Sequence, residues 1–258
     1  MRSLLFALFD RLFAPAPQRA RVAFLKGGAF AHRGLHGPDV LENSRAAFSA
    51  AIAGGFGIEL DVHASRDGDV FVFHDDELDR LSEGKGYFGA TGSAALDALR
   101  LKGTSETIPR LDEILRLIAG KVPLLVEVKT GRRSVAALCK GVLRALEGYQ
   151  GPVAVMSFDA RVGAWFAAHA PHIVRGLVVT EEGPTALPDK ARAAVIRHMD
   201  LWRARPDFLA YDVQDLPSRF ASAQRNRGLP LLSWTVRTSE ERAKVAAHAD
   251  APIFEDLT

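Results

Sequence analysis

The chain has little of several features that would otherwise assign a class of protein. Its 258 residues include one cysteine, Cys139, which excludes an intrachain disulfide and a cysteine-built zinc site. No apolar run reaches the roughly 20 residues that a membrane-spanning helix needs. Lys and Arg number 33 against 31 Asp and Glu, and a formal charge of +2 gives no reason to expect nucleic acid as a partner. The absence of cystine favours a reducing, cytoplasmic compartment.

The amino terminus contains one short apolar segment, at residues 3–13 (SLLFALFDRLF), which an alanine–proline sequence at 14–17 ends. A secretory signal would need an uninterrupted apolar core, and Asp10 and Arg11 interrupt this one, so we do not expect cleavage here. The segment predicts a short amphipathic helix.

Two interpretations of this helix remain open. We favour the one in which it packs as a lid over the bottom of the domain core. In the other it makes a peripheral contact with a membrane, with Phe6, Phe9 and Phe13 immersed. In that case the basic side chains near the anionic headgroups would be Arg2, Arg11, Arg19 and Arg21.

From residue 27 onward, short apolar runs alternate with segments of helical periodicity. Strands are expected at 29–32, 57–62, 124–129, 153–158, 174–180, 208–213, 230–236 and 251–255. Helices are expected from an N-cap at Asn43 to Gly54, and at 111–119, 134–146, 161–169, 189–201, 218–227 and 239–247.

About eight strand–helix units in a chain of this length predict an α/β fold, the (β/α)8 TIM barrel, over residues 27–258. Residues 1–26 are then an amino-terminal apolar helix and linker. A doubly wound open sheet is the alternative, but no glycine-rich phosphate loop follows the first strand. A second apolar run at 70–73 precedes a glycine-containing stretch, 75–109, which we interpret as a small rim insertion after the second strand.

Two strands place acidic side chains on one face. In 57–62 (GIELDV), Glu59 and Asp61 face away from the apolar residues, and in a barrel they point inward. This pair alone is equally compatible with rim salt bridges and with a divalent cation. The next parallel strand repeats the pattern with Glu127 and Lys129, and three converging carboxylates favour one bound Mg²⁺, Ca²⁺ or Mn²⁺.

Basic and titratable side chains accompany the carboxylates. Arg33 and Lys129 can neutralise an anionic substrate, the arginine through a bidentate contact. His32 ends the first strand and His74 ends the apolar run after the second, so the two can act as base and acid in one cycle. The other histidines are interpreted as surface or hydrogen-bonded residues: His36, His63, His169, His172, His198 and His248.

These segments resemble one known family. The carrying motifs are AHRG at 31–34, ENSRAAF from Glu42, IELDV from Ile58, RDGDVFVFHD from Arg66, IPRLDEIL from Ile108, VEVK from Val126 and SWTV at 233–236. In this order they are similar to the glycerophosphodiester phosphodiesterase family, from residue 30 to residue 255. Ser44 and Arg45 stand where the family usually has Thr and Leu, and the end from Ala251 lacks its common aspartate–proline close.

The resemblance implies a TIM barrel with an insertion after the second strand, and a metal-dependent hydrolysis of small glycerophosphodiesters to glycerol 3-phosphate and an alcohol. It places the metal carboxylates on Glu59, Asp61 and Glu127, the catalytic histidines on His32 and His74, and the phosphate contacts on Arg33 and Lys129. Trp234 would supply an apolar wall for the substrate, or else pack in the barrel. One alternative is a lysophospholipase D acting on membrane lipid diesters, which the apolar amino-terminal helix and the aromatic residues near the rim, Phe71, Phe73, Tyr87 and Phe88, favour. The other is a catalytically silent phosphodiester-binding barrel.

Overall fold

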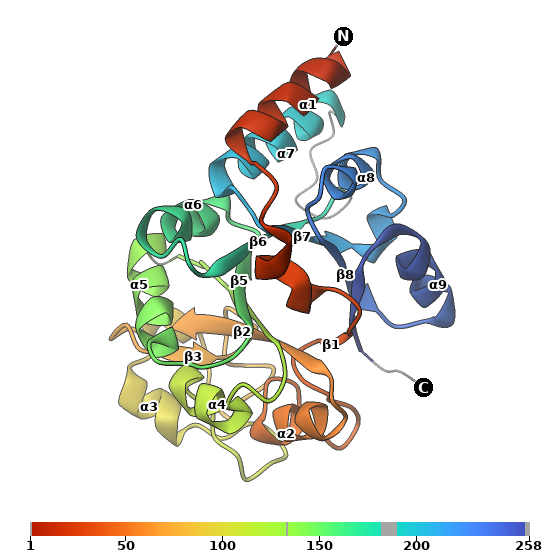
Figure 1. Cartoon of the computed structure of the whole chain (residues 1–258). Helices are drawn as coiled ribbons and strands as arrows, with labels where there is room; N and C mark the ends of the chain where they lie inside the picture. Colours follow the sequence, from red (N-terminus) through yellow and green to blue (C-terminus); the bar gives the residue numbers. More distant parts are fainter. Residues whose placement is uncertain (1, 133, 182–189, 256–258) are drawn as a thin grey trace. The chain divides into compact units, whose positions relative to one another are not determined.

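The computed structural model describes residues 2–132, 134–181 and 190–255 (Figure 1). The chain forms two compact units. One is Phe30–Val153, and the other combines Met1–Ala29 with Ala154–Thr258.

The unit Phe30–Val153 is built on three parallel strands, β1 (Phe30–Ala31), β2 (Gly57–Ala64) and β4 (Leu124–Val128). A short fourth strand, β3 (Val70–Val72), returns antiparallel to β2. The helices of this unit are α2 (Arg45–Ala53), α3 (Ser93–Ala98), α4 (Leu111–Ile118) and α5 (Val135–Leu146), with the 3-10 turn η2 (Phe88–Ala90). The register between β2 and β4 pairs Asp61 with Glu127, which brings the acidic residues of the two strands together.

The start of α2 differs from the prediction. Ser44, not Asn43, is the N-cap, and its hydroxyl accepts a hydrogen bond of 3.1 Å from the Ala47 amide. Asn43 is buried and has a left-handed backbone, with φ 55°. Its side-chain amide donates a hydrogen bond to Asp61. An N-cap residue is extended, so the left-handed Asn43 cannot have that role.

The insertion between β3 and α4 has an apolar interior. Its buried members are Phe71, Phe73, Leu78, Leu81, Phe88, Leu96, Leu101 and Ile108. Two of the aromatic rings, Phe73 and Phe88, are stacked with centroids 5.1 Å apart. The glycine-containing stretch therefore folds around aromatic residues of β3 and the chain just after it, and these aromatics are not exposed at a rim.

The second unit continues the alternation. Its strands β5 (Val153–Ser157), β6 (Val174–Val179), β7 (Phe208–Asp212), β8 (Leu231–Val236) and β9 (Ala251–Phe254) pair in parallel in this order. Between them lie α6 (Ala160–His169), α7 (Lys190–Ala204), η3 (Val213–Asp215), α8 (Arg219–Asn226) and α9 (Ser239–His248). Over the described residues the two units supply eight parallel strands in the chain order of a (β/α)8 barrel. Asp189, where a helix was predicted to begin, lies outside the described residues.

The amino-terminal segment divides into two elements with different partners. The 3-10 helix η1 (Arg19–Leu25) buries Val22 and Leu25. Arg21 of η1 donates to the Ile173 carbonyl at 2.7 Å and to Asp207 at 3.2 Å, two residues that immediately precede β6 and β7. It is therefore η1 that covers the amino-terminal ends of these strands.

The helix α1 (Arg2–Phe13) does not form the predicted lid, because it packs along α7 instead. Phe6 stacks on the His198 imidazole, with ring centroids 4.1 Å apart, and Phe9 lies 5.6 Å from the Trp202 ring. Asp10, which an apolar strand bottom could not accommodate, is only 2% exposed. It accepts hydrogen bonds from His198, Trp202 and Gln224, at 2.8, 2.8 and 2.7 Å.

Replacing Asp10 should therefore destabilise the protein. We expect Asp10→Ala to lower the free energy of unfolding by about 2–4 kcal/mol, since the buried Gln224 and the partly buried His198 and Trp202 lose their acceptor. Denaturant unfolding measures the change, and Asp39→Ala, at an exposed position, is the control. An unchanged midpoint in Asp10→Ala would contradict the anchoring role.

The same carboxylate gives this loss a pH dependence. Burial acts to raise the pKa of Asp10, but the hydrogen bonds from His198, Gln224 and Trp202 outweigh it and hold the pKa below the ordinary value of 3.8. The stabilisation is therefore present above that ordinary value and is lost as the pH falls through the lower, folded-state pKa. The stability difference between the wild-type protein and Asp10→Ala should narrow below a pH of about 4.

Candidate active site

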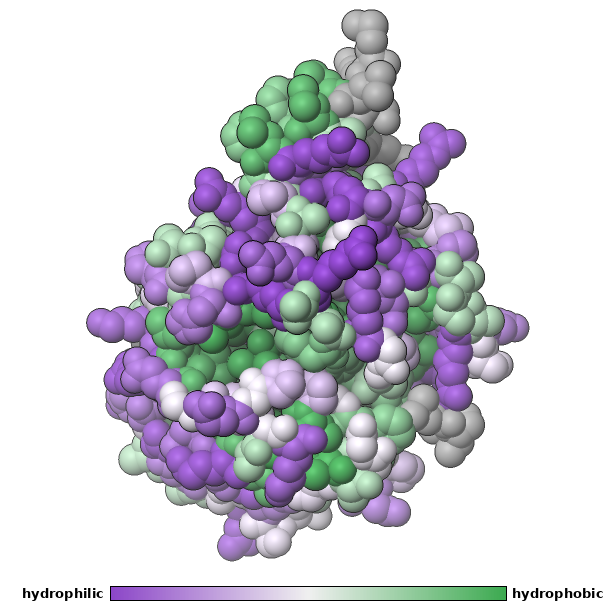
Figure 2. Space-filling model, viewed as in Figure 1, coloured by the Kyte–Doolittle hydropathy of each residue, from purple (hydrophilic) through white to green (hydrophobic). Residues whose placement is uncertain are grey.

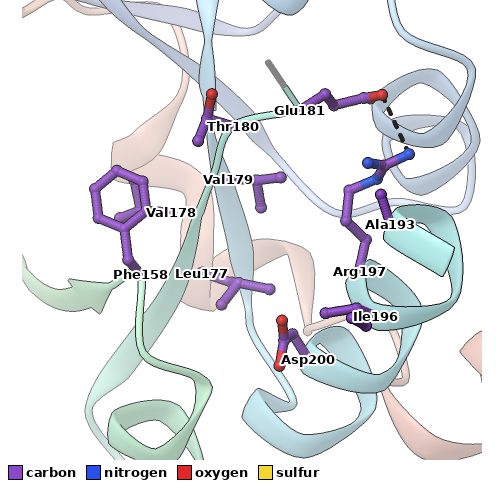
Figure 3. A pocket seen from close by; sticks show the side chains of 10 residues that line it. All are labelled: Phe158, Leu177, Val178, Val179, Thr180, Glu181, Ala193, Ile196, Arg197 and Asp200. Atoms are coloured by element: carbon purple, nitrogen blue, oxygen red, sulfur yellow. Dashed lines mark ion pairs between the residues drawn. The ribbon is translucent and has the colours of Figure 1, made fainter. Parts of the chain in front are cut away.

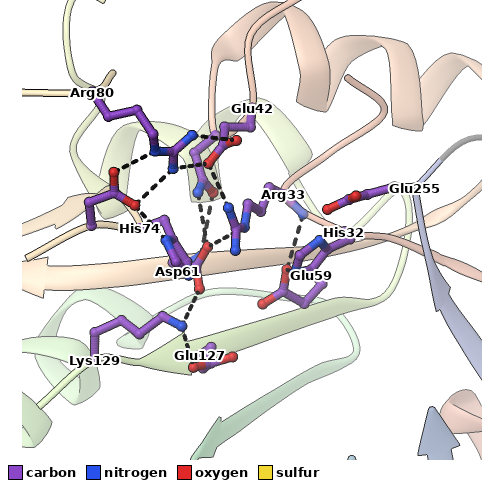
Figure 4. Close-up of polar contacts among 12 residues, drawn as sticks. His32, Arg33, Glu42, Glu59, Asp61, His74, Arg80, Glu127, Lys129 and Glu255 are labelled. Atoms are coloured by element: carbon purple, nitrogen blue, oxygen red, sulfur yellow. Dashed lines mark hydrogen bonds and ion pairs between the residues drawn. The ribbon is translucent and has the colours of Figure 1, made fainter. Parts of the chain in front are cut away.

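Three buried carboxylates meet where the middle of β2 lies beside the carboxyl-terminal end of β4 (Figure 4). Glu59 and Asp61 project from the same face of β2 because side chains alternate along a strand, and the strand register places Glu127 beside Asp61. Each side chain offers an oxygen, and the three oxygens lie within 4.8 Å of one another. The residues are 1%, 1% and 6% exposed, so water does not separate their charges.

Lysine partly compensates this negative charge. The Lys129 ammonium lies 2.6 Å from Glu127 and 3.1 Å from Asp61. Burial acts to raise the pKa of Asp61, but Lys129 and the neighbouring His74 and Arg33 lower it well below the usual range. Burial of Lys129 likewise opposes its charge, and the two carboxylates nevertheless raise its pKa.

Glu59 is the member of the cluster whose charge is least compensated by its neighbours. Burial, together with the charges of Asp61 and Glu127, raises its pKa well above the usual range. One of its oxygens, Oε2, accepts a hydrogen bond of 3.0 Å from the Arg33 amide, whereas the buried Oε1 has no hydrogen-bond partner. A hard divalent cation fits such a donor set, because it prefers carboxylate oxygens and would satisfy both the charge and the unpaired oxygen.

The turn after β1 brings His32 and Arg33 to the carboxylates. Arg33 has a left-handed backbone, with φ 55°, and Gly34 follows at φ 80°. A β-carbon on Gly34 would lie 2.8 Å from that of Ala47, so the close packing of this turn on α2 requires glycine. His32 Nε2 lies 3.9 Å from Glu59 Oε2.

The Arg33 guanidinium lies between two carboxylates. Its Nη1 donates to Glu42 at 2.7 Å, and its Nε lies 3.3 Å from Asp61. These two acids and Glu59 raise the pKa of Arg33, although its burial acts in the opposite direction. The guanidinium therefore stays charged beside the cluster, where an anion could displace part of its carboxylate contact.

His74, predicted as the second histidine, is oriented by its neighbour. Its Nδ1 lies 2.7 Å from Asp75 Oδ1. Arg80 makes a bidentate contact with Asp75, at 2.6 and 2.8 Å, and a second with Glu42, at 2.9 and 3.1 Å. Despite its partial burial, Asp75 has its pKa lowered to about 2 by Arg80 and His74, so it is ionised at neutral pH. Arg80 of the insertion thus joins the segments that follow β1 and β3 (Figure 4).

The prediction missed several polar residues of this network. Glu42, Asp75 and Arg80 were not singled out, and neither was the role of Asn43. The Asn43 amide donates to Asp61 at 3.0 Å and fixes the orientation of that carboxylate. Glu42 and Asn43 begin one of the motifs that carry the family resemblance, and Asp75 follows His74 directly. Their positions in the sequence, within a motif or next to a predicted site residue, could therefore have pointed to them. Arg80 had no such signal.

His63 was interpreted as a surface or hydrogen-bonded residue; it is hydrogen-bonded, and it is buried on β2 rather than at the surface. Its Nε2 lies 2.9 Å from the His74 carbonyl oxygen, and burial lowers its pKa. A neutral, buried imidazole in this position supports the backbone of His74.

Trp234 belongs to the other unit, on β8. Its indole nitrogen donates to the Ala210 carbonyl at 3.1 Å, and its ring meets Phe158 edge to face at 5.5 Å. These contacts are those of a packed tryptophan with one partly exposed face. Its contact with substrate stays a prediction.

The unit that contains Trp234 has a cavity of its own, of about 230 Å³, between β6 and α7 (Figure 3). Leu177 and Ile196 form part of its apolar wall. An ion pair of 3.2 Å between Arg197 and Glu181 closes one side, and Asp200 lies at the other. Burial raises the pKa of Asp200. In this cavity Glu181 and Arg197 neutralise each other, and Asp200 is the remaining carboxylate. The cavity therefore has no cluster of carboxylates like that of Glu59, Asp61 and Glu127.

The strand order defines a (β/α)8 barrel, and its cluster of three carboxylates is a group that could hold a metal ion. The chain belongs to the glycerophosphoryl diester phosphodiesterase family, whose family model matches residues 32–256. The predicted membership is confirmed, and with it an enzyme of the phosphodiesterase class.

Individual relatives agree with this assignment. A protein named glycerophosphodiester phosphodiesterase from Caldanaerobacter subterraneus is 29% identical over 243 residues, which cover 90% of this chain and 95% of that protein. Another of that name from Bacillus altitudinis is 32% identical over 155 residues, covering 56% of this chain and 63% of its own.

Solved structures show the same fold. The structure of an Oleispira antarctica phosphodiesterase in complex with the product sn-glycerol-3-phosphate superposes with a TM-score of 0.74 at 23% identity, covering 89% of this chain and 93% of that one. The structure of glycerophosphodiester phosphodiesterase from Thermotoga maritima gives 0.69 at 24% identity, covering 88% and 93%. The predicted (β/α)8 TIM barrel is confirmed.

Proposed function

We propose that the protein is a metal-dependent phosphodiesterase that hydrolyses glycerophosphodiesters to glycerol 3-phosphate and an alcohol. The observation that carries this proposal is the buried cluster of Glu59, Asp61 and Glu127, in which one glutamate oxygen has no hydrogen-bond partner. Family membership supports the phosphodiester as the bond that is broken. The product named in the Oleispira antarctica structure, sn-glycerol-3-phosphate, supports the glycerol half of the substrate.

The three carboxylates would hold one divalent cation, Mg²⁺, Ca²⁺ or Mn²⁺, which supplies Lewis-acid stabilisation of charge on the phosphoryl oxygens. The remaining electrostatic work belongs to two side chains of the unit Phe30–Val153. Arg33 and Lys129 are partly exposed cations that touch the carboxylate cluster, so both are placed to bind the non-bridging oxygens of a phosphodiester. Such donors stabilise the transition state more than the singly charged diester because negative charge accumulates there.

The two histidines would move the protons. One removes the proton from the attacking oxygen, which is water or the glycerol 2-hydroxyl, and the other protonates the departing alcohol. We assign His32 as the base and His74 as the acid. With Asp75 at its Nδ1, His74 keeps Nε2 as the nitrogen that can exchange a proton, and the carboxylate stabilises the protonated ring. Overall one water is consumed, the bond from phosphorus to the alcohol oxygen breaks, and the alcohol leaves neutral.

The lysophospholipase alternative rested partly on aromatic residues around the insertion. Three of these residues, Phe71, Phe73 and Phe88, are at most 1% exposed and offer no surface to an acyl chain. The fourth, Tyr87, is only partly exposed, and its hydroxyl accepts a hydrogen bond from the Arg132 amide. A silent phosphodiester-binding barrel would lack a histidine or a carboxylate, and this chain has both histidines and all three carboxylates. A water-soluble diester therefore remains the proposed substrate, and a reducing cytoplasm the proposed location, where the buried Cys139 stays a thiol.

Turnover of glycerophosphocholine and of lysophosphatidylcholine should be compared, each with excess chelator and after adding back Mg²⁺, Ca²⁺ or Mn²⁺. We expect the soluble diester to be hydrolysed faster, with glycerol 3-phosphate as a product and no activity in chelator. Preferential hydrolysis of the lysolipid would contradict the substrate assignment. Undiminished activity in chelator would contradict the metal.

A further inference from the structure

The outer side of α1 and α7 is an unusually apolar surface. Eight large apolar side chains are conspicuously exposed in the described part of the chain, and seven of them lie on these two helices. Ile196 also lines the cavity between β6 and α7, so we define the α1–α7 apolar face by the other six: Leu5, Leu8, Leu12, Phe13, Val195 and Met199. Figure 2 shows the hydrophobic side chains gathered over α1. Exposed apolar patches of this kind mark sites that bind a protein, a membrane or a ligand.

This face is a consequence of how α1 is held. Phe6 and Phe9 pack against α7, and Asp10 accepts a hydrogen bond from α8. These contacts fix the rotation of α1 about its axis. Leu5, Leu8 and Leu12 recur at helical spacing on another side of the helix, and they are 55%, 63% and 67% exposed. Because the buried Asp10 prevents α1 from rotating, these leucines cannot turn inward.

The exposed charges on the two helices themselves are of one sign. Among residues 5–13 of α1 and 191–204 of α7, the exposed arginines are Arg11, Arg192 and Arg203. Each helix has one acidic residue, and neither is presented outward. Asp10 is buried among its donors, and Asp200 lines the cavity between β6 and α7 (Figure 3). The apolar face is therefore bordered by cations and lacks an exposed carboxylate among the described residues of α1 and α7.

We propose that the α1–α7 apolar face docks on the surface of an anionic lipid bilayer, with the leucines in the interface and the arginines at the headgroups. An amphipathic helix with basic flanks binds a membrane surface in this way. No described helix is long and apolar enough to cross a membrane, and α1 has only 12 residues, so the contact lies in the interface plane. A second copy of the chain fits less well, because a two-fold contact would bring the same arginines face to face.

The experiment is co-sedimentation of the full chain with vesicles. Phosphatidylcholine vesicles containing about 30% phosphatidylglycerol are compared with pure phosphatidylcholine, since anionic lipid contributes about 1 kcal/mol for each basic residue near the surface. The wild-type protein should pellet with the anionic vesicles only. The variant Leu5→Asn/Leu8→Asn/Leu12→Asn should bind at least about thirtyfold more weakly, because three side chains no longer leave water. Its hydrolysis of a water-soluble diester should not change.

A second pair of variants tests the charges without removing an apolar contact. Arg11→Gln/Arg203→Gln should weaken binding by about tenfold or more. The matched control Arg116→Gln/Arg161→Gln replaces exposed arginines on α4 and α6 and should bind as the wild type does. Equal binding to neutral vesicles, unchanged binding of the leucine variant, or no wild-type binding would overturn the proposal. So would a wild-type dimer in solution that the leucine substitutions dissociate.

Discussion

Glu59→Ala, Asp61→Ala and Glu127→Ala should each abolish divalent-ion binding and turnover together. The three carboxylates share one cation in our proposal, and losing several kcal/mol of charge stabilisation in the transition state slows turnover by about a thousandfold or more. Calorimetric titration with Mg²⁺, Ca²⁺ and Mn²⁺ measures binding, and glycerophosphocholine hydrolysis measures turnover.

Thermal unfolding distinguishes a cation-binding role from a structural one. Glu59 is buried beside two like charges and has an oxygen without a hydrogen-bond partner. Without metal, the melting temperature of Glu59→Gln should therefore be no lower than that of the wild-type protein. The cation should raise the melting temperature of the wild-type protein, and this rise should disappear in Glu59→Gln. Glu147→Gln, an exposed glutamate, is the control. A variant that is inactive yet still binds the ion fully would contradict the assignment of Glu59.

Replacing either histidine should stop proton transfer while leaving cation binding intact. We expect His32→Ala and His74→Ala each to lower kcat by about a hundredfold or more, the usual contribution of a positioned acid or base. Both variants should bind the divalent ion with wild-type affinity, because carboxylates alone hold it. The exposed His172→Ala is the control.

A loss of ion binding in His74→Ala would show that His74 is a ligand and not an acid. The Asp75 contact offers a further distinction. Asp75→Asn retains the shape at Nδ1 but removes the charge that stabilises a protonated His74. It should lower kcat less than His74→Ala does and leave KM nearly unchanged. If Asp75→Asn raised KM by as large a factor as it lowered kcat, that would indicate that Asp75 contacts the substrate.

Alternation along strands made much of the site predictable. Glu59 and Asp61 had to share a face of β2, and the strand–helix order made β2 and β4 neighbours, so Glu127 could be placed beside them. The fold followed from the same repeating pattern. These inferences depend only on local geometry and on the order of elements, both of which can be read along a chain.

Features that depend on distant partners could not be predicted in this way. The position of α1 was predicted wrongly because the donors to Asp10 lie about 190 residues away, on α7, and farther still, on α8. Asn43 was taken for a helix cap because asparagine favours that place, and its partner Asp61 was not visible from the local pattern. In both cases a polar group satisfied its hydrogen bonds through tertiary contacts that outweighed a local preference.

The contact of Arg80 with both Asp75 and Glu42 limits how the insertion can be exchanged between related enzymes. A chimaera that replaces residues 76–109 with the equivalent loop of another barrel would alter the outer surface, but it would also remove the arginine that holds Asp75, the partner of His74, against Glu42. Such a transplant should retain activity only if it carries an arginine able to reach both acids. The insertion therefore limits how far substrate preference can be changed by exchanging it, because its Arg80 also supports the residues that orient His74.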